Sequence, residues 1–374
     1  MKTRAAVLHQ TGLATPYATS KPLVVEELDL DKPGPDEVLV RIRAAGLCHS
    51  DLSVINGDRP RPVPMALGHE AAGEVLECGP GVRDLAPGDR VVMVFVPSCG
   101  GCVPCFEGRP ALCEPAAAAN TRGTLLCGER RLHLGGHDVH HHLGVSAFSE
   151  FAVVSRRSLI QFDPSLSYEE AALFGCAVLT GVGAVVNTAR VPAGATVAVV
   201  GLGGVGLNAL LGGLLVGARE VIAVDLNDDK LKLAKQLGAT ATFNAGDAEV
   251  LARLREHTRG GVDYAFEMAG SVHAMDFAYR STRRGGMTIT AGLSHPEHKW
   301  AVQHVSLVAE ERTVKGSYIG SAVPLRDIPR YMALYQQGRL PVNKLMSDRL
   351  PLDEVNAGFD RLAAGGAIRQ ILTL

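Results

Sequence analysis

The sequence lacks an excess of charge of either sign. It contains 37 Lys and Arg against 39 Asp and Glu, which gives a formal net charge of −2. Proteins that bind nucleic acid or an acidic membrane surface usually carry a basic patch or stripe. The Lys and Arg residues of this chain are scattered instead, and we expect neither partner.

An uninterrupted apolar run of membrane-spanning length is also missing. Residues 191–218 carry no charge, but eight of these 28 residues are glycine and Pro192 lies near the start. Such breakers predict a buried strand, turn and helix rather than a membrane-spanning helix. No apolar region follows Lys2 and Arg4, so we expect no signal peptide and a cytoplasmic protein.

Internal repeats and low-complexity tracts are absent, and the hydrophobic pattern changes along the chain. The first third contains short β-type runs separated by Pro-Gly turns, which predicts an all-β, barrel-like unit. From about residue 178, strands alternate with helices, which is typical of a parallel doubly wound sheet. The segment 114–143 is predicted to be a loop. The predicted domains are 1–177, 178–322, and a return to the first domain over 323–374.

A glycine-rich motif, GLGGVG at 201–206, follows an expected strand and precedes an expected helix. Gly201 would make the tight turn, and Gly203 would let the backbone approach a pyrophosphate. Gly206 would pack helix against strand. Gly204 and Val205 complete the motif. The sequence thus predicts a dinucleotide site, with a purely structural glycine turn as the alternative.

The next expected strand ends at Asp225, 19 residues after Gly206. A carboxylate at this place can bond the ribose hydroxyls and would repel a 2′-phosphate. Asp225 therefore favours NAD over NADP.

Eight cysteines are present, and four of them are clustered at Cys99, Cys102, Cys105 and Cys113. Four thiolates at this spacing can enclose one tetrahedral Zn²⁺ in a closed structural site, within a lobe at about 95–115. An iron–sulfur cluster is the chemical alternative, since thiolates bind both. Disulfides are the third possibility, and a cytosolic chain makes them less favoured.

Three other residues, Cys48, His69 and Cys176, could bind a second metal. Taken singly, each is more often a packed core residue. Their spacing alone does not bring Cys176 to the other two, so this grouping depends on a family resemblance.

The chain resembles the zinc-containing medium-chain alcohol dehydrogenases along nearly its whole length. The resemblance lies in the four-cysteine lobe and in these segments: GHEAAGEV (68–75), GVSAFSEF (144–151), FGCAVLTG (174–181), VVGLGGVGLNAL (199–210), GVDYAFEMAG (261–270) and AIRQILTL (367–374). It implies a GroES-like β-barrel catalytic domain joined to a Rossmann domain. It also implies an enzyme that moves a hydride between an alcohol or aldehyde and NAD.

The resemblance implies that Cys48, His69 and Cys176 hold a catalytic zinc, with a fourth position left for water or the substrate oxygen. With the lobe, this makes two zinc ions per chain. Zinc would stabilise the alcohol as an alkoxide, and the nicotinamide would take the hydride. Ser50 would relay the alcohol proton, and Asp51 would orient His69.

Further roles are implied by position alone. Glu70 would lie behind the catalytic metal, and Phe95 would form a wall of the substrate pocket. The remaining residues would contact the cofactor: His49 and Arg369 at the pyrophosphate, Lys230 near the adenosine ribose, and Thr180, Ala291, Gly292 and Leu293 around the nicotinamide.

Two departures from the family pattern stand out. Many relatives carry a histidine three residues after the relay serine, where this chain has Ser53. The resemblance therefore assigns no residue that passes the proton from Ser50 to solvent. A group of histidines at 133, 137, 140, 141 and 142 could suggest a third metal, but surface or packing roles are favoured.

The long segment between Cys113 and Cys176 goes with dimers in this family, so we expect a homodimer, with a tetramer as the alternative. Two rival functions are considered. One is a glutathione-dependent formaldehyde (S-hydroxymethylglutathione) dehydrogenase, although no Arg follows Cys113 closely and only Arg122 could replace it. The other is a non-catalytic nucleotide-binding zinc scaffold of the same fold.

Overall fold

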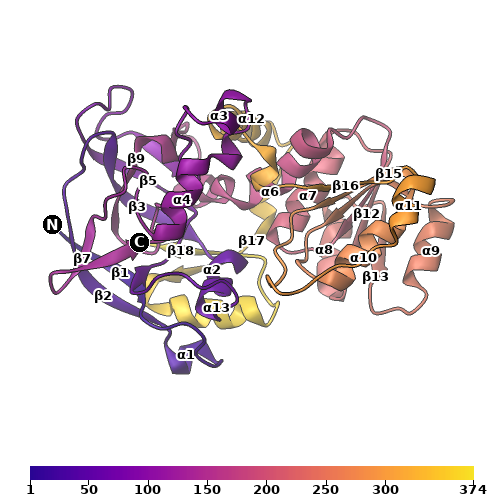
Figure 1. Ribbon diagram of the computed structural model, residues 1–374, viewed down its shortest axis with the longest axis horizontal. Helices are drawn as coiled ribbons and strands as arrows, with labels where there is room; N and C mark the ends of the chain where they lie inside the picture. The colour runs from indigo at the N-terminus through magenta and orange to yellow at the C-terminus, as the bar shows by residue number, and fades with distance from the viewer. The chain divides into compact units, whose positions relative to one another are not determined.

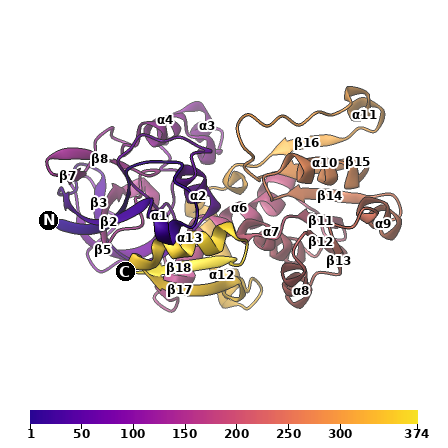
Figure 2. The same cartoon turned by 90° about the horizontal axis from the view of Figure 1, so that it is seen from below.

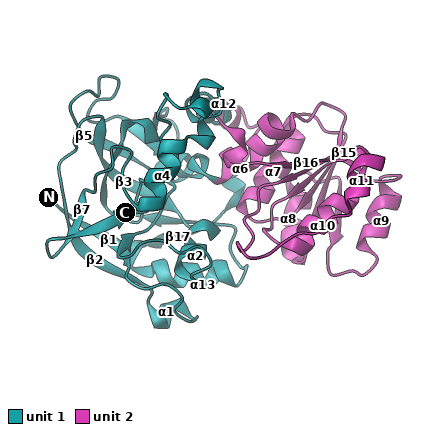
Figure 3. Cartoon of the chain, in the orientation of Figure 1, with its two compact units in different colours: residues 1–176, 323–332, 342–374 teal, residues 177–322, 333–341 magenta.

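The computed structural model describes residues 1–374, which fold into two compact units (Figure 3). The first unit contains 1–176, 323–332 and 342–374, and the second contains 177–322 and 333–341. The expected return segment, 323–374, is therefore divided, because 333–341 belongs to the second unit. The physical reason is the helix α12 (Pro324–Gln336), which runs from one unit into the other without a break.

The first unit contains a closed barrel with the strand order β1-β2-β7-β8-β4. Strand β1 alternates exposed and buried side chains at its start, and Thr3 faces Leu28 of β2 in antiparallel register. Small and branched apolar residues such as Ala5, Val7 and Val139 fill the interior. The bounds are β1 (Lys2–Leu8), β2 (Leu23–Leu30), β4 (Met65–Ala66), β7 (Leu132–Leu134) and β8 (His137–His141).

The other sheet of the first unit has the order β10-β6-β5-β3-β18-β17, and β9 also pairs with β3. Strand β18 pairs antiparallel with β3, with Ile371 facing Gly46, and parallel with β17 (Figure 2). The bounds are β3 (Glu37–Gly46), β5 (Ala71–Cys78), β6 (Arg90–Met93), β9 (Phe151–Ser155), β10 (Leu159–Gln161), β17 (Met346–Pro351) and β18 (Arg369–Thr373).

The helices of the first unit are short, and one of them corrects a prediction. The expected loop 114–143 instead contains a helix, α4, and the strands β7 and β8. Pro115 at the start of α4, Glu114 in its first turn and a run of alanines are good helix-forming features that the loop prediction underweighted. The helices are α1 (Tyr17–Ser20), α2 (His49–Ile55), α3 (Val103–Phe106), α4 (Glu114–Arg122), α5 (Tyr168–Ala172) and α13 (Val355–Ala363).

The second unit is built on a parallel sheet with the order β13-β12-β11-β14-β15-β16 (Figure 1). This is the 3-2-1-4-5-6 order of doubly wound dinucleotide-binding folds. The predicted fold class, a barrel-like catalytic domain plus a Rossmann domain, is confirmed. The bounds are β11 (Thr196–Val200), β12 (Glu220–Asp225), β13 (Ala241–Asn244), β14 (Val262–Glu267), β15 (Thr282–Thr290) and β16 (Thr313–Gly316).

Helices cover both faces of this sheet, which explains why its central strands are apolar throughout. One face of β11, with Ala198 and Val200, packs on Leu254 of α9 and Ala278 of α10. The opposite face, with Val197, lies under α7. The helices are α6 (Ala177–Gly183), α7 (Gly204–Leu215), α8 (Asp228–Leu237), α9 (Val250–His257), α10 (Val272–Ser281) and α11 (His304–Ala309).

No single helix of the chain is both long enough and apolar enough to cross a membrane. One bent pair of helices, Tyr168–Gly175 with Ala177–Ala189, reaches the required length and composition only when the two are taken together.

Candidate active site and metal centres

The first unit brings Cys48, His69, Glu70 and Cys176 together, with one potential ligand atom of each within 4.8 Å of all the others. All four residues are buried. Cys48 directly precedes α2, His69 and Glu70 follow β4, and Cys176 follows the helical segment that begins at Tyr168. The grouping that the family resemblance implied is therefore a spatial cluster.

His69 is oriented by a buried carboxylate. Its Nδ1 lies 2.9 Å from Oδ1 of Asp51, and both side chains are fully buried. In the neutral ring, donation from Nδ1 to this carboxylate leaves the lone pair of Nε2 free, and Nε2 is buried without a hydrogen-bond partner. A buried imidazole nitrogen without a partner beside two thiols suits a metal ligand.

The charges of this cluster are strongly coupled. Burial opposes the charged form of His69, but the Asp51 carboxylate and the Cys48 sulfur hold its pKa well above the usual range. A hydrogen bond from Cys176 is the main reason why the pKa of Cys48 lies well below its usual value. The same hydrogen bond, together with burial, raises the pKa of Cys176. One thiol of the pair therefore ionises readily, and a bound cation would favour ionisation of both.

Glu70 and Arg369 form a fully buried ion pair in the same cluster. Burial raises the pKa of Glu70, whereas the Arg369 guanidinium opposes this shift. A side chain at Gly46 would collide with both partners, since a Cβ there would lie 2.8 Å from the Glu70 carboxyl carbon and 2.9 Å from the Arg369 guanidinium. Arg369 thus lies against Glu70, and its expected contact with a cofactor pyrophosphate stays a prediction.

Helix α2 carries the residues expected to move the proton. Ser50 is half-buried in its first turn, whereas His49 is exposed. The hydroxyl of Ser53 donates to the backbone carbonyl of Ser50 over 2.8 Å, which leaves the Ser50 hydroxyl out of this contact. The Asp51 carboxylate accepts from the backbone N–H of Cys48 over 3.2 Å and so closes the helix start.

Phe95 lies edge-on against the His69 ring, with ring centroids 5.2 Å apart and planes at 86°. It is buried, and its carbonyl accepts a hydrogen bond from the Asn120 side chain. The Phe95 ring thus lies next to the His69 imidazole, whose Nε2 has no hydrogen-bond partner.

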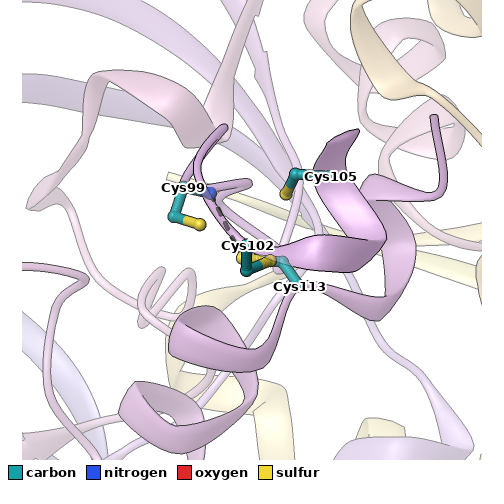
Figure 4. A group of neighbouring side chains, drawn as sticks. All are labelled: Cys99, Cys102, Cys105 and Cys113. Carbon is teal, nitrogen blue, oxygen red and sulfur yellow. Dashed lines mark hydrogen bonds between the residues drawn. The ribbon is translucent and has the colours of Figure 1, made fainter. Parts of the chain in front are cut away.

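The four cysteines of the lobe converge in space (Figure 4), and their sulfur atoms lie within 4.8 Å of one another. All four are free thiols. Backbone N–H groups of Cys99 and Gly101 point at sulfurs of the cluster over 3.2 and 3.3 Å. The hydrogen bond from Gly101 is the main reason why the pKa of Cys99 is lowered to about 7. This donor set suits a closed tetrahedral metal site.

In the second unit, the motif 201–206 links β11 to α7, and its glycines have different surroundings. Gly201 has a φ of +91°, and a Cβ there would meet Ala269 at 2.7 Å. At Gly206 a Cβ would lie 1.8 Å from the Gly201 carbonyl oxygen. Gly203 has nothing within 4 Å of its Cβ position, so the backbone there is open to a ligand. Gly204 and Val205 begin helix α7.

Asp225 lies at the carboxyl end of β12, next to this motif. Its carboxylate accepts from the backbone N–H of Leu202 over 2.6 Å and from that of Asn227 over 2.9 Å. Lys230 lies in the first turn of α8, where the Asn227 side chain caps the helix.

The segment 291–293, expected near the nicotinamide, is held by Glu267, a residue that the sequence analysis did not single out. Glu267 is buried at the end of β14 and accepts from the backbone N–H groups of Ala269 and Gly270, over 2.8 and 2.6 Å. Thr290 donates to the same carboxylate over 2.7 Å. A buried Glu at a parallel strand's carboxyl end, beside a turn, was a usable signal.

The backbone carbonyl of Glu267 also accepts from Ala291 and Gly292. The turns after β14 and β15 are thereby fixed to one residue. Leu293 follows with about half of its side chain exposed. Thr180 lies half-buried in α6, the helix that packs against α7.

Two family models match the chain. The alcohol dehydrogenase GroES-like domain matches residues 34–164, and the zinc-binding dehydrogenase domain matches residues 204–337. An NDMA-dependent alcohol dehydrogenase of Amycolatopsis methanolica is 41% identical over 100% of this chain and 99% of its own length. The chain belongs to the zinc-dependent medium-chain alcohol dehydrogenase family.

Other members of this dehydrogenase family differ in their named substrates. An S-(hydroxymethyl)glutathione dehydrogenase of Paracoccus denitrificans is 36% identical over the full length of both chains. The solved structure of a benzyl alcohol dehydrogenase from Acinetobacter calcoaceticus has a TM-score of 0.93 at 31% identity, and covers 100% of this chain and 99% of its own.

The family uses zinc and a nicotinamide cofactor. A zinc-binding dehydrogenase from Sinorhizobium meliloti, solved with NADP, has a TM-score of 0.80 at 27% identity and full coverage of both chains. The chain is thus a zinc-dependent oxidoreductase of alcohols or aldehydes, and its cysteines at 48 and 176 and at 99, 102, 105 and 113 lie in two separate groups of potential metal ligands.

Proposed function

We propose that this dehydrogenase oxidises a primary alcohol, or reduces the matching aldehyde, with NAD and a catalytic zinc held by Cys48, His69 and Cys176. The observation that carries the proposal is the orphan Nε2 of His69, buried beside two thiols that lie within 4.8 Å of the His69 ligand atom and of each other. A second zinc in the four-cysteine lobe is part of the proposal.

Residues of the chain itself move the proton and orient the metal ligand. When bound, zinc supplies a Lewis acid that lowers the pKa of the alcohol. Ser50 accepts the hydroxyl proton of the alcohol, while Asp51 keeps the proton of His69 on Nδ1. The contact of Ser53 with the Ser50 carbonyl provides no onward relay, so the proton would leave Ser50 to water, or to the ribose of a bound cofactor.

The preference for NAD is supported by Asp225. Its carboxylate at the end of β12 supplies negative charge where a 2′-phosphate would bind in this fold. The hydrogen bond to Leu202 also ties this charge to the glycine motif.

Formaldehyde bound to glutathione is the second candidate substrate, because the named activity of one full-length relative is S-(hydroxymethyl)glutathione dehydrogenase. The place where the family carries an arginine after the fourth lobe cysteine is occupied here by helix α4, which ends in the exposed Arg122. We favour a simple alcohol on this ground.

The deciding experiment measures NADH formation with primary, secondary and aromatic alcohols, and with formaldehyde in the presence and absence of glutathione. In a parallel series NDMA replaces added NAD as the electron acceptor and its own reduction is followed, since a 41% identical relative is named for it. We expect turnover of a primary alcohol with NAD and no stimulation by glutathione. Strict dependence on glutathione would move the assignment to the second candidate.

Metal analysis separates an enzyme from a non-catalytic scaffold of the same fold. We expect two zinc ions per chain, and Cys176→Ala should remove one of them and abolish turnover while NAD binding persists. Cys78→Ala is the matched control, because this thiol belongs to neither cluster. One zinc per wild-type chain, or retained turnover in Cys176→Ala, would contradict the proposal.

We further propose a homodimer that pairs through strand β16. This strand is the edge of the parallel sheet, and all four of its residues are exposed. Val305 and Val308 of the preceding helix α11 are also exposed, at 67% and 68%. An open strand edge beside exposed apolar side chains is a surface that proteins usually cover.

A cytoplasmic location completes the proposal, and it is supported by eight cysteines that are all free thiols, since disulfides are rare in a reducing compartment.

A further inference from the structure

His142 lies beside the buried pair formed by Asp51 and His69. Its Nδ1 is 3.2 Å from Oδ1 of Asp51, the same oxygen that His69 contacts. This distance is short enough for a hydrogen bond, but the alignment does not make one, and Nδ1 of His142 is buried without a hydrogen-bond partner. The side chain is buried, at 1% exposed, and nothing described so far gives it a role.

The ring of His142 also touches the ring of His69. Their centroids are 5.6 Å apart and their planes meet at 83°. Phe95 makes the comparable edge-on contact at 5.2 Å and 86°. The imidazole of His69 therefore has two perpendicular rings and one carboxylate around it, which together restrict its rotation.

Backbone hydrogen bonds hold the His142 segment against the His69 segment. Strand β4 pairs with β8, and the N–H of His142 donates to the carbonyl of Ala66. Further along, the backbone of Ala147 bonds to that of Gly68, one residue before His69. The two histidines thus lie on neighbouring backbones of one unit, and their approach does not depend on flexible loops.

A tight turn fixes the direction of the His142 side chain. Its carbonyl accepts from the N–H groups of Val145 and Ser146, and the Ser146 hydroxyl accepts from the N–H of His142 over 3.1 Å. Leu143, Gly144 and Ser146 all have φ values between +52° and +67°. A left-handed conformation at non-glycine residues persists only where the surrounding structure enforces it.

A metal shared by Asp51, His69 and His142 is the competing interpretation, because their ligand atoms lie within 4.8 Å of one another. It would require the proton of His69 Nδ1 to be lost. That proton already serves the 2.9 Å contact with Asp51 and leaves Nε2 for the cysteine cluster. One imidazole with one metal and one carboxylate is the simpler arrangement.

We propose that His142 is a positioning residue for the catalytic zinc: its Nδ1–H and its ring edge hold Asp51 and His69 in the orientation that aims Nε2 of His69 at the two cysteines. This inference rests on the proposed function, because it requires zinc at Cys48, His69 and Cys176. His142 itself touches neither substrate nor cofactor in this role.

The test measures metal affinity in the full-length zinc protein by competition with a chromophoric chelator. His142→Phe keeps a ring and removes the donor, whereas His142→Asn keeps an amide N–H where Nδ1 lies. Partners of metal-binding histidines typically contribute 10- to 100-fold to metal affinity. We expect His142→Phe to weaken the catalytic zinc about 10-fold, and His142→Asn to stay within about 2-fold of wild type.

Two controls make the result specific. The catalytic zinc is recognised as the phase of release that Cys176→Ala lacks, and release from the four-cysteine lobe serves as an internal standard. His141→Gln is the matched variant, because His141 is equally buried but accepts a hydrogen bond from the Arg131 backbone. We expect it to bind both zinc ions as wild type does.

A second measurement reports the geometry of the catalytic metal site rather than its metal affinity. With cobalt in place of zinc, the visible absorption bands of the catalytic site should change in His142→Phe and return in His142→Asn. His142→Leu, a second variant without a donor, should behave like His142→Phe if loss of the donor is the cause, and should differ from it if the phenyl ring alone disturbs folding.

Three outcomes would count against these ideas. Wild-type zinc affinity in both donor-free variants would overturn the role of His142. Equal weakening in His142→Phe and His142→Asn would also overturn it, because the residue would then act by packing alone. A Cys176→Ala protein that releases zinc in the wild-type manner would instead contradict the proposed function, and with it the inference.

Discussion

At the scale of single residues, buried carboxylates position the functional groups of both units. Asp51 fixes His69, Glu70 pairs with Arg369, and Glu267 joins two turns of the Rossmann unit. All three carboxylates are buried; Asp51 and Glu267 accept from N–H groups, and Glu70 is paired with a guanidinium, which are the conditions under which a buried charge is tolerated. The metal-binding and cofactor-binding groups are thus held in place mainly through these carboxylates.

The first prediction concerns cofactor choice at Asp225. Asp225→Asn should raise the ratio of kcat/KM for NADP to that for NAD about 10-fold or more, because the charge that repels a 2′-phosphate is removed. The amide oxygen can still accept from the N–H of Leu202. Asp225→Gly should shift the ratio in the same direction with a larger loss of total activity.

Asp229→Asn is the control for this measurement, since Asp229 is an exposed acid on α8 that pairs with Lys232. It should leave the ratio unchanged. An unchanged ratio in both Asp225 variants would remove this residue from cofactor discrimination.

The second prediction concerns the pH dependence of stability at His141. Burial, followed by the charges of Arg130 and Arg131, lowers the pKa of His141 to about 3. In the unfolded chain its pKa is about 6.5, so between these values only the unfolded state binds the proton. His141 therefore makes the free energy of unfolding fall as pH falls from 6.5 toward 3, by about 1.4 kcal/mol per pH unit.

His141→Gln should remove this contribution while its side-chain oxygen still accepts from the Arg131 N–H. Urea unfolding of both proteins at pH 7, 6 and 5 gives the slopes, and the variant should show the shallower one by about one proton. Parallel slopes would show that His141 is protonated in the folded state.

At the scale of elements, the turn between β11 and α7 separates a folding constraint from a binding constraint. Gly206 faces the Gly201 carbonyl, whereas Gly203 faces open space. The third prediction follows from this difference. Gly206→Ala should destabilise the second unit by about 2 kcal/mol or more, because the Cβ forces the helix from the strand.

Gly203→Ala should keep the wild-type Tm and weaken NAD binding about 10-fold, since its methyl group would occupy the path of the pyrophosphate. Thermal unfolding and cofactor titration of the two variants distinguish these effects. A lowered Tm in Gly203→Ala would mean that the space beside Gly203 does not accept a methyl group without a loss of stability.

The elements also show how far sequence reasoning reaches. The glycine motif and the four cysteines are local patterns, so spacing alone predicted their surroundings. Cys176 could join Cys48 and His69 only through family resemblance, because its approach depends on how distant segments of the first unit pack. His142 was grouped with a histidine-rich segment, since nothing local reveals that pairing of β4 with β8 carries it to Asp51.

At the scale of the whole molecule, the exposed edge strand of the second unit is where we propose that two copies of the chain pair. The fourth prediction is that Val314→Asp in β16 weakens dimerisation at least 10-fold, because two like charges would meet across a symmetric strand pair. Sedimentation velocity over a range of concentrations measures the effect.

Val24→Asp is the matched control for this variant, because Val24 is similarly exposed on a strand of the first unit. It should leave the dimer intact. A monomeric wild type, or a dimer that survives Val314→Asp, would contradict pairing through β16.

The position of β18 has a consequence for how the protein is made. This strand lies between β3 and β17, and Arg369 at its start pairs with Glu70 beside the cysteines. Residues 369–373 leave the ribosome after residue 341, the last of the second unit, and domains fold as they emerge. The Rossmann unit is therefore complete while the first unit still has an open sheet edge and an unpaired Glu70. A nascent chain of this enzyme would acquire its cofactor-binding half before its metal-binding half is closed.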